Sequence, residues 1–451
     1  MKFDPGGIMN DFANSGCLQD HPPPRCSLPS TMTKLLIPTL LLALPLCAAD
    51  PKFKKLTLSN EFWCEGAHFA DFDQDGNNDI CAGPFVWWGP DFKERSAYNA
   101  PKPDRNKPLT DEEYLPNHAK FIESAPEFKG KAVDPLGYSD YFLTNTHDFN
   151  SDGKMDILVF SWPGDITAWY ENPGKRTSEA WKRHIVFDVT DNESPQLGDM
   201  DGDGKPELIC HTGGRLGYAS LDWSNPGAKA TYHAIAKPDI KRYFRYTHGY
   251  GFGDINGDKR PDILDKDGWR EQPGTASEEW AFHAVPFAPE GARGGSQMQV
   301  YDVNGDGRND VLTSWDAHGY GFAWYEQKAD GSFETHQILG EKPEDSPHGV
   351  KFTQTHATTM ADVDGDGVLD LITGKRFWAH GPNKDAEPGA PAVLYWFQIK
   401  RDGKGGADLI PHEIDNDSGV GTQVTAGDVN KDGKTDVIVG NKKGVFVFLQ
   451  E

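Results

Sequence analysis

The sequence predicts an all-β protein, a seven-bladed β-propeller with a calcium-type loop in each blade. Three observations support this prediction. One loop pattern rich in carboxylates recurs seven times along the 451 residues. Each copy continues into short runs rich in β-branched and aromatic residues, which are typical of strands. The 49 Gly and 32 Pro suit short strands joined by tight turns.

The repeated loop reads Asp-x-Asp/Asn-x-Asp-Gly-x-x-Asp/Glu. Ca²⁺ takes about six to eight oxygen ligands, and side chains at positions 1, 3 and 5 of a tight loop converge on one point, which position 9 can complete. Gly at position 6 permits the sharp turn. The predicted calcium ligands are Asp71, Asp73, Asp75, Asp79, Asp148, Asn150, Asp152, Asp156, Asp199, Asp201, Asp203, Glu207, Asp254, Asn256, Asp258, Asp262, Asp302, Asn304, Asp306, Asp310, Asp362, Asp364, Asp366, Asp370, Asp428, Asn430, Asp432 and Asp436.

These loops predict up to seven Ca²⁺ sites. The copy over 254–262 is the doubtful one, because Lys259 stands where Gly is expected. An EF-hand would require Glu at position 12 and flanking helices, and no copy has that Glu. Dockerin-type loops continue into helices, whereas these continue as strands, for example over 310–314. The formal net charge of −24 equals the number of loop carboxylates and argues against a nucleic-acid partner.

Each repeat contains enough sequence for four strands. One run precedes the loop, one follows it, and an aromatic run comes next. The fourth run carries a histidine at a recurrent position, which predicts a structural role for His184, His233, His283, His336 and His412. Seven four-stranded units of this length are typical of a propeller.

The loops, their flanking strands and their number resemble FG-GAP repeats of the VCBS-type and integrin α-like propeller family. The resemblance covers roughly residues 52–451. It implies that the loop carboxylates bind calcium at one rim, and that the strand before each loop is innermost and lines the central channel. It says little about function, because this fold serves adhesion, scaffolding and catalysis alike.

An innermost position for these strands predicts where a ligand binds. Residues about six before each loop then lie at the channel end away from calcium: Glu65, Phe142, Glu193, His248, Ser296, His356 and Thr422. Turns that follow the next strand reach the same face. Their aromatic and basic side chains suit sugar rings and acidic groups. The predicted ligand-binding residues are Glu65, Trp88, Trp162, Arg215, His248, Trp269, Arg270, His318, His356, Arg376, Trp378 and His380. The alternative is that the tryptophans are core wedges and the charges lie in solvated turns.

Two functions from different classes follow. The first is a secreted calcium-binding propeller that binds a glycan, acidic glycans included, or an extracellular protein on the face opposite the calcium loops. It needs no catalytic signature, and the sequence contains no familiar one. It involves no nucleic acid and no membrane span.

The second function is a polysaccharide or sugar lyase or dehydratase, a carbon–oxygen lyase. Ulvan lyases and the fungal aldos-2-ulose dehydratase, which the chain resembles in fold, perform such eliminations. The reaction needs a base, an acid and a cationic clamp. The candidates are His248 or His356, Tyr250 or Tyr320, and Arg270 or Arg376, respectively. Whether the chain is an enzyme stays open, with the non-catalytic module favoured.

The N-terminal region predicts processing. Residues 1–31 resemble no targeting segment and are expected to be a non-native or disordered extension. Residues 32–49 combine a cationic start, an apolar run and small residues up to Ala49, which predicts a signal peptide cleaved near that residue. The propeller then spans 50–451, and the expected location is secreted, periplasmic or on the cell surface. Cys64, Cys81 and Cys210 are expected in the core, with a disulfide between the first two as the alternative.

Overall fold

The computed structural model describes residues 51–100, 137–381 and 384–451. The predicted extension and signal peptide, 1–31 and 32–49, lie outside these ranges. Within them, the chain consists of 27 β-strands and one short 3-10 helix, η2 (Pro343–Asp345). The all-β prediction is therefore confirmed. None of the described helices has the length and hydropathy needed to cross a membrane.

The strands from 67 to 234 form two antiparallel sheets. The four-stranded sheet contains β2 (Ala67–Ala70), β3 (Asp79–Ala82), β4 (Phe85–Trp87) and β5 (Arg95–Ala97). The seven-stranded sheet contains β6 (Leu143–His147), β7 (Asp156–Phe160), β8 (Asp165–Glu171), β9 (Lys182–Gly198), β10 (Glu207–Thr212), β11 (Arg215–Ser220) and β12 (Thr231–Ala234). The long β9 pairs with β8 through its first half and with β10 through its second half, so it joins two four-stranded units.

The second half forms three sheets. The eight-stranded sheet contains β13 (Tyr250–Gly253), β14 (Asp262–Asp265), β15 (Gly268–Glu271), β16 (Ala281–Ala284), β17 (Gln297–Tyr301), β18 (Asp310–Ser314), β19 (Phe322–Gln327) and β20 (Phe333–Leu339). The next contains β21 (Thr358–Ala361), β22 (Asp370–Gly374), β23 (Leu394–Arg401) and β24 (Ala407–Asp415). The last contains β25 (Val424–Gly427), β26 (Asp436–Asn441), β27 (Gly444–Gln450) and β1 (Phe53–Ser59).

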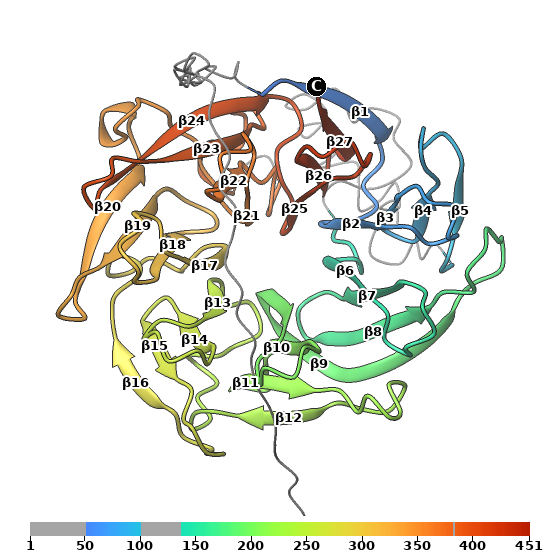
Figure 1. Ribbon diagram of the computed structural model, residues 1–451, viewed down its shortest axis with the longest axis horizontal. Coiled ribbons are helices and arrows are strands. Elements are labelled where there is room, and N and C mark those ends of the chain that lie inside the picture. The colour runs from blue at the N-terminus through green and yellow to red at the C-terminus, as the bar shows by residue number, and fades with distance from the viewer. Residues whose placement is uncertain (1–50, 101–136, 382–383) are drawn as a thin grey trace, which may run out of the picture. The chain divides into compact units, whose positions relative to one another are not determined.

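The sheets follow one another around a ring, with β2, β6, β13, β17, β21 and β25 nearest its centre (Figure 1). The ring is closed by antiparallel pairing of β1 with β27, from Phe53 opposite Gln450 onwards. When β9 is counted in both of its units and β13–β16 are separated from β17–β20, the described strands form seven four-stranded units. This grouping agrees with the number of loops in the sequence.

The recurrent histidines each stack on an aromatic ring of the neighbouring strand. The pairs lie face to face, for example His283 on Trp269 with centroids 4.0 Å apart and His412 on Trp396 at 4.3 Å. The same contact is made by His184 on Trp169, His233 on Tyr218 and His336 on Trp324. Such stacking is a repeated packing contact, which matches the structural role expected for these histidines.

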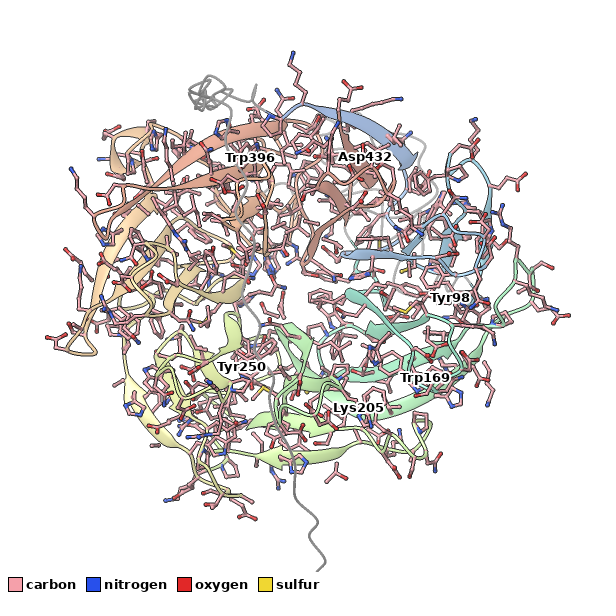
Figure 2. All side chains as sticks on the ribbon, in the orientation of Figure 1. Tyr98, Trp169, Lys205, Tyr250, Trp396 and Asp432 are labelled. Carbon is pink, nitrogen blue, oxygen red and sulfur yellow. The ribbon has the colours of Figure 1, made fainter. Side chains whose placement is uncertain are left out.

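Large apolar side chains fill the spaces within and between the sheets (Figure 2). Trp169, Trp396, Tyr98 and Tyr250 are among the largest buried residues. The thiols of Cys64, Cys81 and Cys210 are also buried and free, so the sequence's alternative of a disulfide between the first two is not realised. Burial keeps these sulfurs away from solvent, as expected for core cysteines.

Candidate functional site

Six of the seven loops share one hydrogen-bonding scheme, shown here by the copy at 302–310; in the third copy Asp199 accepts the N–H groups of Gly202 and Gly204 instead. Asp302, at position 1, accepts the backbone N–H of Asp306 (3.0 Å) and that of Gly307 (2.9 Å). Gly307 has φ of 86°, a left-handed conformation that favours glycine. In the doubtful copy Lys259 adopts φ of 71°, so the loop keeps its shape despite the side chain.

The carboxylate at position 9 has a role that the sequence did not reveal. Asp310 is fully buried, and its two oxygens accept the backbone N–H groups of Val303 (3.1 Å) and Gln327 (2.8 Å). This contact ties the start of the loop to the third strand. The same double contact is made by Asp79, Asp156, Asp262, Asp370 and Asp436, while Glu207 makes one bond, to Met200.

The donor set of the loops fits a hard cation, because it consists of oxygens only. In the first copy, oxygens of Asp71, Asp73 and Asp79 lie within 4.8 Å of one another, as do those of Asp199, Asp201 and Asp203 in the third. Basic side chains compete for some of these oxygens. Arg176 contacts Asp73 (2.5 Å) and Asp75 (3.1 Å). The carboxylates at position 5 pair with the position 7 base in three copies: Asp152 with Lys154, Asp258 with Arg260 and Asp306 with Arg308.

At the opposite end of the inner strands, polar residues meet in the ring centre. Each inner strand runs toward its loop and the next strand runs back. The residues just before an inner strand and just after the second strand therefore lie on the face away from the loops, here called the distal face. All seven inner positions named from the sequence are buried: Glu65, Phe142, Glu193, His248, Ser296, His356 and Thr422.

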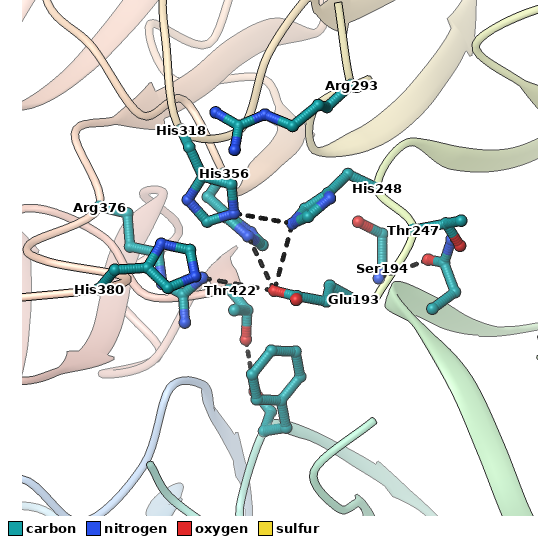
Figure 3. A network of polar contacts seen from close by, with 12 residues as sticks. Glu193, Ser194, Thr247, His248, Arg293, His318, His356, Arg376, His380 and Thr422 are labelled. Carbon is teal, nitrogen blue, oxygen red and sulfur yellow. Dashed lines mark hydrogen bonds and ion pairs between the residues drawn. The ribbon is translucent and has the colours of Figure 1, made fainter. Parts of the chain in front are cut away.

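Three histidines and a glutamate converge at this centre (Figure 3). Glu193 lies in β9, His248 precedes β13, His356 precedes β21, and His318 lies in the turn after β18. Oε2 of Glu193 is 3.2 Å from Nε2 of His356 and 3.4 Å from Nε2 of His248, which is itself 3.0 Å from Nε2 of His318. Four potential ligand atoms lie within 4.8 Å of one another, all on buried residues. This group is called the central cluster.

A buried ion pair borders the central cluster. Arg376, which follows β22, contacts Oε1 of Glu65 at 3.1 Å and Oε2 of Glu193 at 3.5 Å, and both Arg376 and Glu65 are 1% exposed. A buried guanidinium is tolerated only when carboxylates surround it. The Glu65–Arg376 pair therefore links the sheet of β2–β5 to the sheet of β21–β24. The contact of Arg376 with Glu193 also holds one side of that carboxylate in place.

The surroundings shift the pKa values of the cluster. Burial, followed by the charge of Arg376, lowers the pKa of His356 to about 3. Burial, then His248 and His356, lower the pKa of His318 far below its ordinary value. Burial acts upward on Glu193, but His248 and His356 outweigh it and hold the pKa of this carboxyl well below its usual range. At neutral pH a carboxylate therefore faces neutral imidazoles of His318 and His356.

The central cluster forms part of the wall of a pocket of about 920 Å³. Trp162 contacts the tilted rings of Tyr138 (centroids 4.0 Å apart) and Tyr246 (5.8 Å) in another part of the wall. The segment 239–247, between β12 and β13, supplies much of the rest. The lining carboxylates and cations are equal in number: Glu193, Asp239, Asp265 and Asp267 against Lys241, Arg242, Lys266 and Arg293.

Some predicted ligand residues meet at this pocket. Trp162, His248, His318 and His380 line it. Glu65, His356 and Arg376 lie behind it in the buried network. His380 binds Asp385 through Nδ1 (2.8 Å). Trp378 is buried, with its indole N–H donated to the carbonyl of Pro388 (2.8 Å).

Other predicted residues lie elsewhere. Trp88 follows the third strand of its sheet, which returns to the loops, and Arg176 lies over its ring at 5.2 Å. Arg215 is exposed and lines a different pocket, between β11 and the segment before β16. The ring of Trp269 is stacked against that of His283. Arg270, in β15, contacts the carbonyl of Trp280 (3.2 Å).

The two predicted acids are also outside the central cluster. Tyr250 is fully buried, and its hydroxyl donates to the carbonyl of Gly217 (2.9 Å). Tyr320 lies beside Lys351, whose Nζ is 5.6 Å from its ring centroid. Asp385 and the aromatic segment 239–247 were missed in the sequence. Their only signal was a departure from the repeat, because neither belongs to a recurrent position.

Comparison with known protein families finds matches to three segments of the chain. An FG-GAP-like repeat model matches residues 148–210 and 302–373, and an FG-GAP repeat model matches 420–446. The comparison with curated proteins finds no match.

Several solved structures are similar to this chain at low identity. A lectin from Agrocybe aegerita that recognises non-reducing terminal N-acetylglucosamine has 16% identity and a TM-score of 0.44, covering 82% of this chain and 81% of the lectin. BBS1N in complex with ARL6DN has 10% identity and a TM-score of 0.48, covering 88% and 96%. The biofilm matrix protein Bap1 of V. cholerae has 18% identity and a TM-score of 0.33, covering 58% of this chain and 38% of that one.

Likeness of this degree carries no information about ligands. By its strands and its family matches, the chain is therefore an all-β protein with three segments that are similar to FG-GAP repeats.

Proposed function

We propose that this chain is a secreted, calcium-binding β-propeller. It binds a carbohydrate in the pocket next to the central cluster, here called the distal pocket. The observation that carries the proposal is the group of exposed aromatic side chains in the pocket wall. Phe244 is 44% exposed and Tyr246 38% exposed; Tyr246 lies beside Trp162, and Phe244 lies beside Tyr246. Aromatic rings kept in solvent at the mouth of a pocket are typical of ligand sites.

The size and charge of the pocket suit a saccharide. A volume of about 920 Å³ lies within the range of about 300–1,000 Å³ found for small-molecule sites. Arg242 is held by Asp265 (2.9 Å) and Arg293 by Asp316 (2.9 Å), so these guanidinium groups are already neutralised. Balanced charges with many hydrogen-bonding groups favour a neutral sugar over a strongly acidic one.

Binding can be tested with a panel of immobilised neutral and uronate-containing polysaccharides. Trp162→Ala and Tyr246→Ala should each weaken binding at least about tenfold, as central aromatic contacts do. Leu369→Ala is a matched control, because Leu369 is 37% exposed and directly precedes Asp370 of the sixth loop. Equal affinity of all three variants and the unaltered chain, or no binding to any polysaccharide, would contradict the proposal.

Secretion and calcium binding belong to the same proposal. The support for secretion is the sequence of residues 32–49, and the support for calcium is the all-oxygen donor set of the loops. N-terminal sequencing of exported protein should begin near Asp50. A mature protein that retains residues 32–49 would contradict export by this route.

A second candidate function is a carbon–oxygen lyase acting on sugars. Its support is that His248, His356 and Arg376 gather around Glu193 next to the pocket. Against it, the predicted acids Tyr250 and Tyr320 do not join this group, so binding is proposed first. Incubation with uronate-containing polysaccharides tests it, because elimination forms an unsaturated product that absorbs ultraviolet light. Binding without any such product would exclude this candidate.

A further inference from the structure

We propose that the central cluster, formed by Glu193, His248, His318 and His356, binds a transition-metal ion of the Zn²⁺ class. This site is distinct from the calcium loops and does not depend on the proposed carbohydrate binding. Its ligands are three imidazole nitrogens and one carboxylate oxygen, the set that borderline-soft divalent metals prefer.

Three of the six spacings among the four atoms match those of a metal shell, and the other three are below 4.8 Å. Zinc binds His nitrogen and carboxylate oxygen at about 2.0–2.1 Å in a tetrahedron, which places its ligand atoms about 3.3 Å from one another. The contacts are 3.0 Å between His248 and His318, 3.2 Å between His356 and Glu193, and 3.4 Å between His248 and Glu193. These side chains come from four separate inner segments and point at one another (Figure 3).

Hydrogen bonds cannot serve every close contact between these four atoms at once. Nε2 of a neutral imidazole either donates one proton or accepts one. Nε2 of His248 faces two groups, Nε2 of His318 and Oε2 of Glu193, and that same oxygen also faces Nε2 of His356. A single proton on His248 can serve only one of its neighbours. A divalent cation serves all four atoms at once through their lone pairs.

The surrounding residues have the arrangement of a supporting shell. Nδ1 of His318 lies 3.6 Å from Oδ1 of Asp385, which also contacts Nδ1 of His380 at 2.8 Å. A carboxylate behind a metal-bound imidazole orients the ring and strengthens the ligand. On the other side, Arg376 shares its charge between Glu65 and Glu193, which leaves one excess negative charge among these three groups. A cation would compensate it.

A metal could enter from the distal face. Glu193, His248 and His318 line the pocket, while His356 is fully buried behind them. The ion would therefore be held at the edge of the proposed carbohydrate pocket, with one side toward the ligand space. The adjacent group of His318, His380 and Asp385 offers only two histidines.

The test uses the whole mature chain and Zn²⁺ as the probe. The protein is equilibrated with zinc in excess calcium and dialysed, and zinc per chain is measured by mass spectrometry. Affinity is measured by competition with a chromogenic chelator. One zinc per chain is expected. His318→Gln and Glu193→Gln should each weaken zinc binding by at least tenfold, and Asp385→Asn, a positioning variant, by about 10–100-fold.

His283→Gln is the matched control, because it removes a histidine that also faces a carboxylate, Glu271 at 2.9 Å, outside the central cluster. It should retain one zinc. Circular dichroism shows whether each variant folds, and Glu193→Gln preserves side-chain shape if His318→Gln does not fold. Absence of zinc from the unaltered chain, or equal zinc affinity in Glu193→Gln, would overturn the proposal. Trp162→Ala should keep its zinc even if it loses carbohydrate, so the two proposals fail separately.

Discussion

The two ends of the inner strands are built on opposite principles. At one end, each loop draws its carboxylates from nine consecutive residues, and the same arrangement recurs seven times on the exposed face. At the other, the central cluster takes one residue each from four distant segments, all of them buried. Residues that recur at the same position in every unit have a structural role, because the fold also repeats. Residues that break the repeat at an equivalent position, such as His248 and Glu193, indicate where the molecule performs a specific task.

The largest expected loss of stability comes from removing the buried ion pair at the centre of the ring. Arg376→Met should leave Glu65 and Glu193 buried without their cation and lower the free energy of unfolding by about 3–5 kcal/mol. Arg293→Met removes a guanidinium of which 52% of the side chain is exposed and which pairs with Asp316, and should cost less than about 1 kcal/mol. Urea unfolding of both variants measures the difference. Similar losses would mean that the centre is no more sensitive than the surface.

The next effect separates the two roles of a loop carboxylate. Asp310→Ala should leave two buried N–H groups, of Val303 and Gln327, without an acceptor and cost about 2 kcal/mol or more. Asp306→Ala, in the same loop, loses a partly exposed pair with Arg308 and should cost less than about 1 kcal/mol. Thermal and urea unfolding without calcium measure both. A smaller loss in Asp310→Ala than in Asp306→Ala would refute the anchoring role.

Calcium should stabilise the loops and leave the centre unaffected. Each site at ten times its Kd adds about 1.4 kcal/mol by mass action, so chelation should lower Tm and millimolar calcium should restore it. Asp201→Ala should reduce this calcium-dependent gain, whereas Glu193→Gln should not. Asp330→Ala, which removes an exposed carboxylate outside the loops, is the control. A Tm that is indifferent to calcium would contradict calcium binding by the loops.

The smallest expected change in stability concerns one loop that differs from the other six. Lys259 has φ of 71° where the other copies have Gly, and a left-handed conformation costs a non-glycine residue about 1 kcal/mol or more. Lys259→Gly should therefore raise the free energy of unfolding by about 1 kcal/mol. Lys205→Gly, at position 7 of the third loop, should give no gain, because its backbone lies outside the left-handed region. Chemical denaturation of both variants tests this.

Much of the fold was predictable because its determinants are local. The loop pattern, the strand after it and the stacked histidines are each visible within a few residues. The inner positions could be found for the same reason, since a fixed offset of about six residues before each loop places Glu193, His248 and His356 at one level.

The rest of the site depends on contacts that no local pattern contains. Gly249, with φ of 75°, turns the chain between His248 and Tyr250, so the tyrosine points into the core. Trp88 lies beside the loops because the third strand runs back toward them. Asp385 reaches His318 from another sheet, a pairing that only the ring geometry creates.

The pairing of β1 with β27 has a consequence for biosynthesis. The last sheet receives its outer strand from the beginning of the described chain and its other three from the end. A nascent polypeptide therefore cannot complete the circle until β27 has left the ribosome. Glu65 and Arg376, 311 positions apart in sequence, meet only in the circular form. Formation of the Glu65–Arg376 pair is therefore expected to come late in folding and to report whether the circle has closed.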